Sequence, residues 1–384
     1  SESKFEPIWV AGFMSGTSID AVDVAMIRTD GESVLEFGPA IERKYEREER
    51  VLLQQVTSAA RDWSWSGPGP ESLFDEARKT VVETHHKAWM QLVSEAGLER
   101  IGAGSTGYPA AVGVHGQTVL HRRPGPASTG ATLQLMDGPA LAARIGLPVA
   151  YDFRTADVAA GGEGAPLAPI YHRALLERLG GGPAVVLNLG GVANITARLS
   201  DGTLVAFDTG PANGPIDEWV EGHDRGDHDI GGRFAGAGLV HEGLLSQLFE
   251  HPWFSMPPPK SLDRFDFNAS MARGLSFEDG AATLTAFSAR AVAAGIAQLP
   301  EAPQRVIACG GGRHNPTLMR MLAEDLPCPL LSAEDAGWRG DSIEAEAFAL
   351  LAVRTLRDLP ISWPGTTGVP TAMRGGQIAH PVDN

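Results

Sequence analysis

The chain has 384 residues, of which 43% are hydrophobic and 20% charged, a composition typical of a globular protein with room for two domains. Its formal net charge of −16 argues against nucleic acid or an anionic membrane as a partner, because both bind clustered Lys and Arg. The two cysteines, Cys309 and Cys328, are too few for a disulfide framework. No apolar run reaches about 18 residues, so we expect no membrane-spanning helix and a cytoplasmic location.

The first predicted elements are two strands, residues 8–15 and 21–27, joined by a turn of small residues. The return strand alternates Val22, Val24 and Met26. Residues 15–18 are all small or hydroxylated, which lets backbone amides approach a polyphosphate closely. The turn lacks the Lys of a Walker A loop, and a strand rather than a helix follows it, so we do not expect the P-loop fold.

A strand over residues 33–45, a helix over 46–60 and a long amphipathic helix over 70–96 follow. The loop between the two helices carries Trp63 and Trp65 among Ser, Gly and Pro residues. Two aromatic rings there either form a binding surface for a partner or sugar or pack within the loop. We favour packing, which is the commoner role.

Residues 113–121 are predicted to form a strand that leads into a polar turn with His115 and Gln117. Both side chains can hydrogen-bond a hydroxylated ligand. A His at the end of a strand serves the fold at least as often as it serves a ligand, so both interpretations stay open here.

Arg154 lies near Asp152 and Asp157, ahead of a glycine-rich loop over residues 161–164. This pattern is typical of the polar wall of a ligand site, and an ordinary ion-pair cluster is the alternative. A helix is predicted over residues 169–179.

The second half of the chain repeats the opening pattern. Residues 184–196 again read as a strand, a turn with Gly190 and Gly191, and a second strand. The similarity is slight, but the recurrence predicts two related lobes that face one cleft.

Asp208 is the candidate for acid–base chemistry. It ends the apolar run 204–207, and Thr209, Gly210 and Pro211 follow at once. A strand that delivers an acid to such a turn exposes it beside backbone N–H groups that bind anions. An acid against a phosphate activates an attacking hydroxyl or water in phosphoryl transfer. The alternative is an Asx turn that closes a hairpin, and the similar loop near the amino terminus favours the catalytic hypothesis.

A third glycine-rich turn, Gly310–Gly312, lies between a predicted strand over residues 305–309 and a helix over residues 316–324. Three glycines at a strand-to-helix turn let a planar or anionic ligand lie against the backbone. This turn therefore indicates a nucleotide site.

Two acidic segments have structural explanations as well as functional ones. Asp341 and Glu344 have the spacing of a capping box for a helix over residues 344–357, and a ligand role for Glu344 stays open beside it. Residues 223–229 resemble a metal cluster in composition, but no His pair has helical ligand spacing. We therefore predict no metal site there.

In this order, the segments resemble the anhydro-N-acetylmuramic acid kinase family over nearly the whole chain. The resemblance rests on eight linked motifs: Met14-Ser15-Gly16-Thr17-Ser18-x-Asp20, His115-Gly116-Gln117-Thr118, Asp152-Phe153-Arg154 with Asp157 and Gly161-Gly162-x-Gly164-Ala165-Pro166-Leu167, Leu189-Gly190-Gly191-x-Ala193-Asn194, Phe207-Asp208-x-Gly210-Pro211, Pro258-Pro259-Lys260-Ser261, Gly310-Gly311-Gly312-x-x-Asn315, and Glu344-Ala345-x-Ala347-Phe348.

The resemblance implies an α/β, two-lobed ribonuclease-H-like fold of the actin and hexokinase type, with mixed sheets flanked by helices and a central cleft. It places residues 1–150 and about 345–384 in an N-terminal lobe and residues 151–344 in a C-terminal lobe. It implies a kinase of peptidoglycan recycling that takes 1,6-anhydro-N-acetylmuramic acid, ATP and water. The products are N-acetylmuramic acid 6-phosphate and ADP. ATP with Mg²⁺ and a homodimer are the implied cofactors and assembly, without a dedicated metal cage.

The family's site residues carry over position by position. Asp208 corresponds to the general base. The sugar pocket corresponds to His115, Gln117, Arg154, Asp157 and Glu344. The nucleotide side corresponds to Gly16, Thr17, Ser18, Ile19, Asp20, Ala21, Val22, Asp23, Gly190, Gly191, Asn194, Gly210, Gly310, Gly311, Gly312 and Asn315. The chain departs from the family at Ala21 and Ala212, where glycine is usual.

Two other functions fit the same motifs. One is a kinase of this architecture that uses another sugar, because the shape of the pocket decides the substrate. The other is a binding protein that opens and closes on nucleotide without chemistry; the presence of Asp208 argues against it.

Overall fold

The computed structural model describes residues 4–99, 107–263 and 266–382, which fall into two units. Unit 1 holds the residues up to 178 and from 342 onward, and unit 2 holds residues 179–341. The first boundary therefore lies later than the predicted residue 150. Residues 151–178 go with unit 1 because β7 (Val149–Tyr151) pairs in its sheet and α5 (Pro169–Glu177) packs on α11 (Ile343–Leu356).

Unit 1 is built on a six-stranded mixed sheet in the order β13-β7-β4-β1-β2-β3. β1 (Ile8–Ser15), β2 (Ala21–Thr29) and β3 (Val34–Lys44) form an antiparallel meander. β4 (Ala111–Val114) runs parallel to β1, β7 runs parallel to β4, and β13 (Gln377–Ala379) closes the sheet antiparallel to β7.

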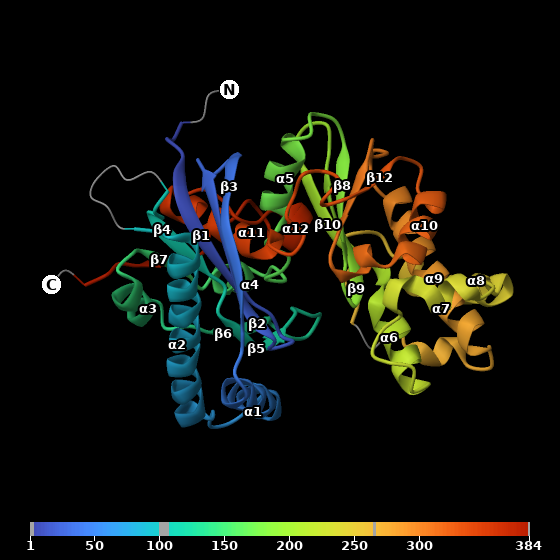
Figure 1. Ribbon diagram of the computed structural model, residues 1–384, viewed down its shortest axis with the longest axis horizontal. Coiled ribbons are helices and arrows are strands. Elements are labelled where there is room, and N and C mark those ends of the chain that lie inside the picture. The colour runs from blue at the N-terminus through green and yellow to red at the C-terminus, as the bar shows by residue number, and fades with distance from the viewer. Residues whose placement is uncertain (1–3, 100–106, 264–265, 383–384) are drawn as a thin grey trace. The chain divides into compact units, whose positions relative to one another are not determined.

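Helices cover both faces of this sheet (Figure 1). α1 (Arg47–Trp63) and α2 (Glu71–Ala96) bury the face that carries Phe13, Val22 and Val24, as the alternation in the return strand predicts. α11 packs on the opposite face against β1, β2 and β4. The remaining elements of unit 1 are β5 (Gln117–Arg122) and β6 (Ala131–Leu135), which form a separate ribbon, and the short helices α3 (Gly138–Ile145), α4 (Thr155–Ala159) and α12 (Pro364–Thr367).

Two glycines in the middle of strands let α11 approach the sheet at backbone distance. A Cβ on Gly12 would overlap the carbonyl oxygen of Ala345, and a Cβ on Gly113 would overlap that of Phe348. Neither glycine has a positive φ, so the requirement is close approach and not turn geometry.

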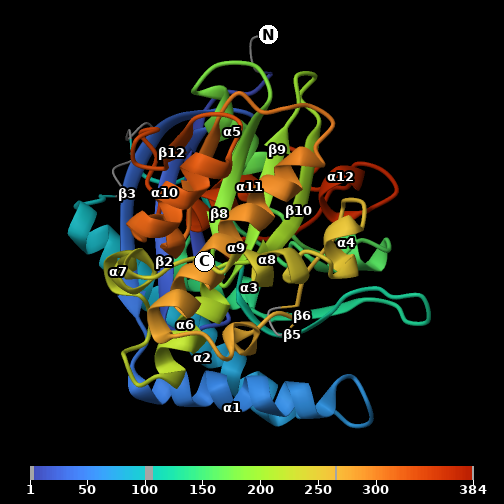
Figure 2. The same cartoon turned by 90° about the vertical axis from the view of Figure 1, so that its right-hand side faces the viewer.

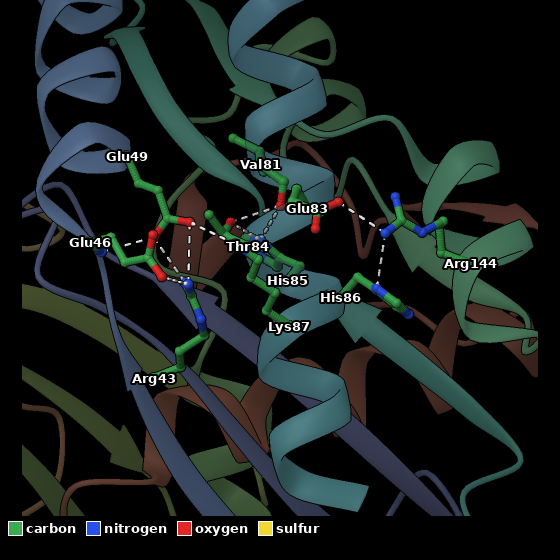
Figure 3. A network of polar contacts seen from close by, with 10 residues as sticks. All are labelled: Arg43, Glu46, Glu49, Val81, Glu83, Thr84, His85, His86, Lys87 and Arg144. Atoms are coloured by element: carbon green, nitrogen blue, oxygen red, sulfur yellow. Dashed lines mark hydrogen bonds and ion pairs between the residues drawn. The ribbon is translucent and has the colours of Figure 1, made fainter.

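A polar network fastens β3, α1 and α2 together at one end of the sheet (Figure 3). Arg43 of β3 donates Nη1 to Oε1 of Glu49 at 3.0 Å and Nη2 to Oε2 at 3.2 Å, and both side chains are only about one-tenth exposed. Glu49 also closes the capping box of α1 by accepting the N–H of Glu46. A buried pair of this kind orders its surroundings through paired charges and fixed geometry.

Unit 2 is built on a five-stranded sheet in the order β10-β9-β8-β11-β12. β8 (Ala184–Leu189), β9 (Val192–Arg198) and β10 (Leu204–Pro211) form an antiparallel meander. β11 (Val306–Cys309) runs parallel to β8, and β12 (Leu330–Ser332) runs parallel to β11. This repeats the arrangement β3-β2-β1-β4-β7 of unit 1 strand for strand. Each unit thus has the ribonuclease-H-like order that the resemblance implied.

α9 (Phe277–Ala297) and α10 (Pro316–Asp325) cover one face of this second sheet (Figure 2). α9 is long and apolar enough to cross a membrane by composition, but 78% of its most apolar window is buried inside the protein. Packing in the core of unit 2 therefore accounts for its composition.

The other elements of unit 2 are short. The α-helices are α6 (Asn213–Gly222), α7 (Arg233–Ala237) and α8 (Glu242–Leu248), and the 3₁₀ turns are η1 (Ile230–Gly232), η2 (Pro252–Ser255), η3 (Ala269–Ala272) and η4 (Gly311–His314).

Candidate active site

A row of polar side chains lies across three neighbouring strands of the unit 2 sheet. Asp208 of β10 pairs with Asn194 of β9, and Asn194 pairs with Asn188 of β8. Residues directly opposite in adjacent strands point to the same face, so these three side chains lie side by side. Their neighbours in sequence, Phe207 and Ile195, face the α9 and α10 side and belong to the apolar core. All three polar residues are half-buried.

The chain around Asp208 is shaped to aim its carboxylate. β10 continues through Asp208 to Pro211, so the acid lies inside an edge strand and not at its end, and the register slips by one residue between Asp208 and Gly210. Such a bulge redirects the side chains beside it. A Cβ on Gly210 would lie 2.7 Å from the Cβ of Ala291, which explains the glycine.

Residues 258–262 hold Asp208 from the other side. The N–H of Leu262 donates to Oδ2 of Asp208 at 2.7 Å, and the N–H of Asp208 donates to the carbonyl of Lys260 at 3.0 Å. Lys260 is buried, with its ammonium donating to the carbonyls of Trp253 and Phe254 and lying 4.3 Å from the Trp253 ring centroid. Burial lowers the pKa of Lys260. The Pro258–Ser261 motif thus fastens the loop that fixes the acid.

The predicted glycine turns of unit 2 converge beside this row. The N–H of Asn213 donates to the carbonyl of Gly190, and those of Ala212 and Gly214 donate to the carbonyl of Gly191. A Cβ on Gly310 would lie 2.6 Å from Oδ1 of Asn188, and a Cβ on Gly312 would lie 2.6 Å from the Cβ of Leu189. Backbone from three separate segments therefore meets next to the polar row.

A pocket of about 310 Å³ opens beside these turns. Its walls come from the start of α6 (Asn213, Ile216 and Asp217), from residues 228–231, and from the turn Gly311–Asn315. The predicted residues Gly311, Gly312 and Asn315 line it. Asp217, which lies in the middle of α6, also lines the pocket and gave no signal in the sequence.

In unit 1, the predicted phosphate-binding turn connects β1 to β2. Thr17, Ser18 and Asp20 are exposed at its tip, and Arg50 lies 3.7 Å from Asp20. The side chains of Ile19 and Val22 are buried in the core. Ala21 and Asp23 are half-buried in β2. A ligand at this turn would meet backbone and hydroxyl groups, with the side chains of Ile19 and Val22 turned away from it.

The turn before β5 is tied directly to this hairpin. Oγ of Ser15 donates to the carbonyl of Gly116 at 2.9 Å, and Nε2 of Gln117 donates to the carbonyl of Gly16 at 3.2 Å. Oε1 of Gln117 is buried and has no partner among the residues that the structure describes. Gln117 therefore links the two predicted halves of the ligand site.

His115 and Arg154 form a fixed pair. Nε of Arg154 donates to Nε2 of His115 at 3.1 Å, and Nδ1 of His115 lies 2.7 Å from the carbonyl of Gly116. These contacts require a neutral imidazole with its proton on Nδ1. Burial, helped by the charge of Arg154, lowers the pKa of His115 to about 3. Burial also lowers the pKa of Arg154 to about 10, opposed by Glu344 and Asp157, so Arg154 stays charged at neutral pH.

Asp157 stabilises the glycine-rich loop over residues 161–164 through hydrogen bonds. It is 2% exposed, with Oδ1 accepting the N–H of Gly164 at 2.8 Å and Oδ2 accepting the hydroxyls of Ser362 and Thr367 at 2.6 Å each. Arg154 also donates Nη1 to the carbonyl of Gly164. Asp157 thus holds the loop that Arg154 contacts, and its own carboxylate is enclosed.

The capping box predicted for Asp341 and Glu344 is wrong. Ser342 is the N-cap of α11 without a capping hydrogen bond, and Asp341 instead accepts Nη2 of Arg313 at 2.9 Å. The physical reason is that the two units divide between Asp341 and Ser342, so the acid pairs within unit 2. Desolvation of its carboxyl raises the pKa of Glu344, and the charge of Arg154 opposes this.

Two further segments have local partners. Trp63 packs edge-on against Phe74 and donates Nε1 to the carbonyl of Gly67, and Arg122 lies over Trp65, which favours loop packing.

Within residues 223–229, Asp229 accepts the N–H groups of Phe234 and Ala235 in α7. In the described ranges, no group of three or more His, Cys, Asp or Glu side chains could hold a metal ion.

Sequence comparisons place this site among known proteins. The family model described as anhydro-N-acetylmuramic acid kinase matches residues 8–381. The chain is 51% identical over 377 residues to a protein of Rhizobium rhizogenes with that name, covering 98% of this chain and 100% of the relative. It is 53% identical to one of Caulobacter vibrioides, covering 96% and 98%.

Solved structures are more distant. Component A of (R)-2-hydroxyglutaryl-CoA dehydratase from Acidaminococcus fermentans aligns with a TM-score of 0.45 at 11% identity, over 91% of this chain and 99% of that one.

Proposed function

Because the chain belongs to the anhydro-N-acetylmuramic acid kinase family, we propose that it phosphorylates 1,6-anhydro-N-acetylmuramic acid on its 6-oxygen as the anhydro ring is hydrolysed. The products are N-acetylmuramic acid 6-phosphate and ADP. The observation that carries the proposal is the family match over residues 8–381, which includes Asp208 and both glycine-rich halves.

Asp208 is the general base of this reaction. Its carboxylate takes a proton from water as the water oxygen bonds to the anomeric carbon. The bond from that carbon to the bridging oxygen breaks, and the released 6-oxygen bonds to the γ-phosphorus of ATP as ADP leaves. The hydrogen bond from Leu262 to Oδ2 fixes the orientation of the carboxylate. Positioned proton transfer contributes about 10²–10⁴-fold to such a rate.

ATP fits the backbone turns better than it fits any cluster of charged side chains. The turn over residues 16–20 and the turns at Gly190 and Gly310 present small residues and backbone amides, which suit phosphate oxygens. Mg²⁺, when bound, neutralises charge on adjacent phosphates. Since the described residues contain no cluster of three metal ligands, phosphates and water would supply most of its coordination.

The sugar side is built around Arg154. Its Nε and Nη1 are engaged by His115 and Gly164, whereas no partner of Nη2 is found in the described part of the chain. The substrate carries a carboxylate on its lactyl group, and a rigidly held guanidinium is a suitable partner for a carboxylate. His115 stays neutral and orients Arg154. Gln117 and Glu344 contribute an amide and a carboxylate for sugar hydroxyls.

The family resemblance also supports a cytoplasmic homodimer, which we include in the proposal. Light scattering of the purified chain tests the assembly: a mass near twice 40.5 kDa supports it, and a monomeric mass contradicts it.

Turnover with a set of sugars tests the proposed activity. ADP release is measured with anhydro-N-acetylmuramic acid, N-acetylmuramic acid and N-acetylglucosamine, and the mass of each sugar product is determined by mass spectrometry. The proposal is supported if only the anhydro sugar is turned over and its product has gained the mass of one water and one phosphoryl group. Turnover with a simple hexosamine indicates a different sugar kinase, and binding of nucleotide without turnover indicates a sensor.

The first prediction concerns the base itself. Asp208→Asn keeps the shape of the side chain but removes its basicity, so kcat falls by about 10³-fold or more while ATP affinity is kept. Asp201→Asn, in the exposed hairpin between β9 and β10, is the matched control and keeps full activity. Unchanged turnover in Asp208→Asn contradicts the assignment.

A further inference from the structure

A buried lysine lies behind the loop over residues 258–262, which holds Asp208. Lys260 is 7% exposed, and its ammonium donates to the carbonyls of Trp253 and Phe254 at 3.1 and 3.3 Å. Desolvation alone lowers the pKa of Lys260, and no carboxylate among the described residues forms an ion pair with it. A buried charge without a counter-charge costs free energy, so stability alone gives no reason for a lysine at this position.

The carbonyls that Lys260 binds belong to a firmly packed turn. Trp253 and Phe254 lie in η2, and the Phe254 ring packs edge-on against the fully buried Phe287 at a centroid distance of 5.6 Å. The attachment is reciprocal, because Nε1 of Trp253 donates to the carbonyl of Ser261 at 3.0 Å. The loop is therefore attached to the core of unit 2 at two successive residues.

The loop passes this attachment on to Asp208 through two hydrogen bonds. The carbonyl of Lys260 accepts the N–H of Asp208 at 3.0 Å, and the N–H of Leu262 donates to Oδ2 of Asp208 at 2.7 Å. Because β10 is the edge strand of its sheet, the loop supplies partners that a neighbouring strand would supply elsewhere. Lys260 thus binds η2 through its side chain and the acid through its backbone.

We propose that Lys260 is a positioning residue for the general base, acting through residues 258–262 to fix the direction of the Asp208 carboxylate. The inference rests on the proposed role of Asp208 and adds a residue that acts from behind the acid. Loss of the ammonium would release the loop from η2, so the hydrogen bond from Leu262 to Oδ2 would weaken. A displacement of about 1 Å in a reacting group lowers a rate by as much as about 10²-fold.

Lys260→Met tests the inference, because methionine keeps an unbranched apolar side chain and removes the ammonium. We expect kcat to fall about 10- to 100-fold, with KM for ATP and for the sugar close to the wild-type values. The acid limb of the pH profile of kcat/KM should move up by about one pH unit. The direction follows because Asp208 loses a hydrogen bond to its charged form, which raises its pKa.

A double-mutant cycle separates positioning from a general structural effect. Once Asp208→Asn has removed the base, Lys260→Met should lower the residual kcat by less than about 3-fold, because residues that act as one unit have non-additive effects. A residue that supports the fold independently of the base would lower kcat by the same factor in both backgrounds. That additive result overturns the inference.

Gln298→Met is the matched control. Nε2 of Gln298 donates to the carbonyls of Phe254 and Met256 at 3.3 and 3.2 Å, so this variant also removes hydrogen bonds to η2 and its end. It leaves the loop over residues 258–262 attached, and its kcat and pH profile should match those of the wild type. A loss of rate equal to that of Lys260→Met would show that η2, and not Lys260, controls the rate, which also overturns the inference.

Failure of the inference differs from failure of the proposed function. Additive effects together with a nearly inactive Asp208→Asn variant refute the inference and keep the base. Non-additive effects measured with a different sugar keep the inference and refute the proposed substrate, whereas full activity of Asp208→Asn refutes both the base and the inference. If Lys260→Met does not fold, Lys260→Gln, which keeps an N–H donor, gives the same comparison with a smaller loss of rate.

Discussion

The two sheets have the same strand order, but the two units use their glycines and polar side chains differently. In unit 1, Gly12 and Gly113 lie in mid-strand and serve the packing of α11. In unit 2, Gly190 and Gly191 lie in the turn between β8 and β9 beside the polar row, and a Cβ on Gly191 would meet no atom within 4 Å.

The acidic groups divide in the same way. Asp157 of unit 1 has both carboxylate oxygens occupied by the protein, whereas Asp217 of unit 2 has no hydrogen-bond partner in the residues that the structure describes. The same strand order therefore holds two kinds of acidic group. The carboxylate of Asp157 is fixed by hydrogen bonds within unit 1, and the carboxylate of Asp217 in unit 2 has no hydrogen-bond partner among the described residues.

The largest expected effect comes from the glycines. Gly12→Ala would force its Cβ into the backbone of α11, so we expect a loss of about 3 kcal/mol or more in the free energy of unfolding. Gly191→Ala should change it by less than about 0.5 kcal/mol, because no atom lies within 4 Å of the added Cβ. Urea denaturation measures the free energy of unfolding of both variants. An equal loss of stability in the two variants would show that the glycines of the two units do not differ in this way.

A smaller effect separates the two aspartates. Asp157→Asn weakens three hydrogen bonds to a buried carboxylate, so we expect the free energy of unfolding to fall by about 2 kcal/mol. Asp75→Asn, exposed on α2, is the matched control and should have little effect. A stable Asp157→Asn protein that has lost only sugar affinity would show instead that Asp157 contacts the ligand.

A third difference between the units is the acid sensitivity of unit 1, which builds up gradually as the pH falls. Burial lowers the pKa of His85 and His172 to about 4 and that of His115 to about 3, from 6.5, and all three lie in unit 1. Their folded pKa values are depressed, so the unfolded chain binds protons first as pH falls below 6.5, and stability is lost between pH 6.5 and about 4. Each histidine contributes a slope of about 1.4 kcal/mol per pH unit in that window.

Urea denaturation at pH 7 and pH 5 measures this slope, and hydrogen exchange at pH 5 should show unit 1 opening first. His85→Phe keeps a ring that can stack on Phe13, 5.8 Å away in the wild type, and should reduce the slope by one histidine. An unchanged slope in this variant would mean that His85 is not buried in its neutral form.

Sequence alone predicted most of the elements that carry the site. The strand over residues 305–309, its glycine turn and the following helix appear as β11, η4 and α10, since turn residues and apolar runs act locally. The sequence also shows Asp208 next to a glycine turn, and its role as general base remains a prediction.

What sequence could not predict depends on register and on long-range pairing. The alignment of Asn188, Asn194 and Asp208 follows from strand pairing, and no local pattern in the sequence fixes that register. Asp157 looked like a ligand group because its partners, Ser362 and Thr367, lie about two hundred residues later. Asp341 looked like part of a cap because a spacing of three residues does not show that a boundary between units intervenes.

The insertion of unit 2 between Arg178 and Ser342 has a consequence for biosynthesis. A growing polypeptide presents the meander β1–β3 long before it presents α11, so the face of that sheet that contains Gly12 lacks its covering helix while roughly 300 further residues are translated. Unit 2 is contiguous and can fold on the ribosome during that interval. Chaperones are therefore expected to engage the nascent amino-terminal sheet until α11 emerges.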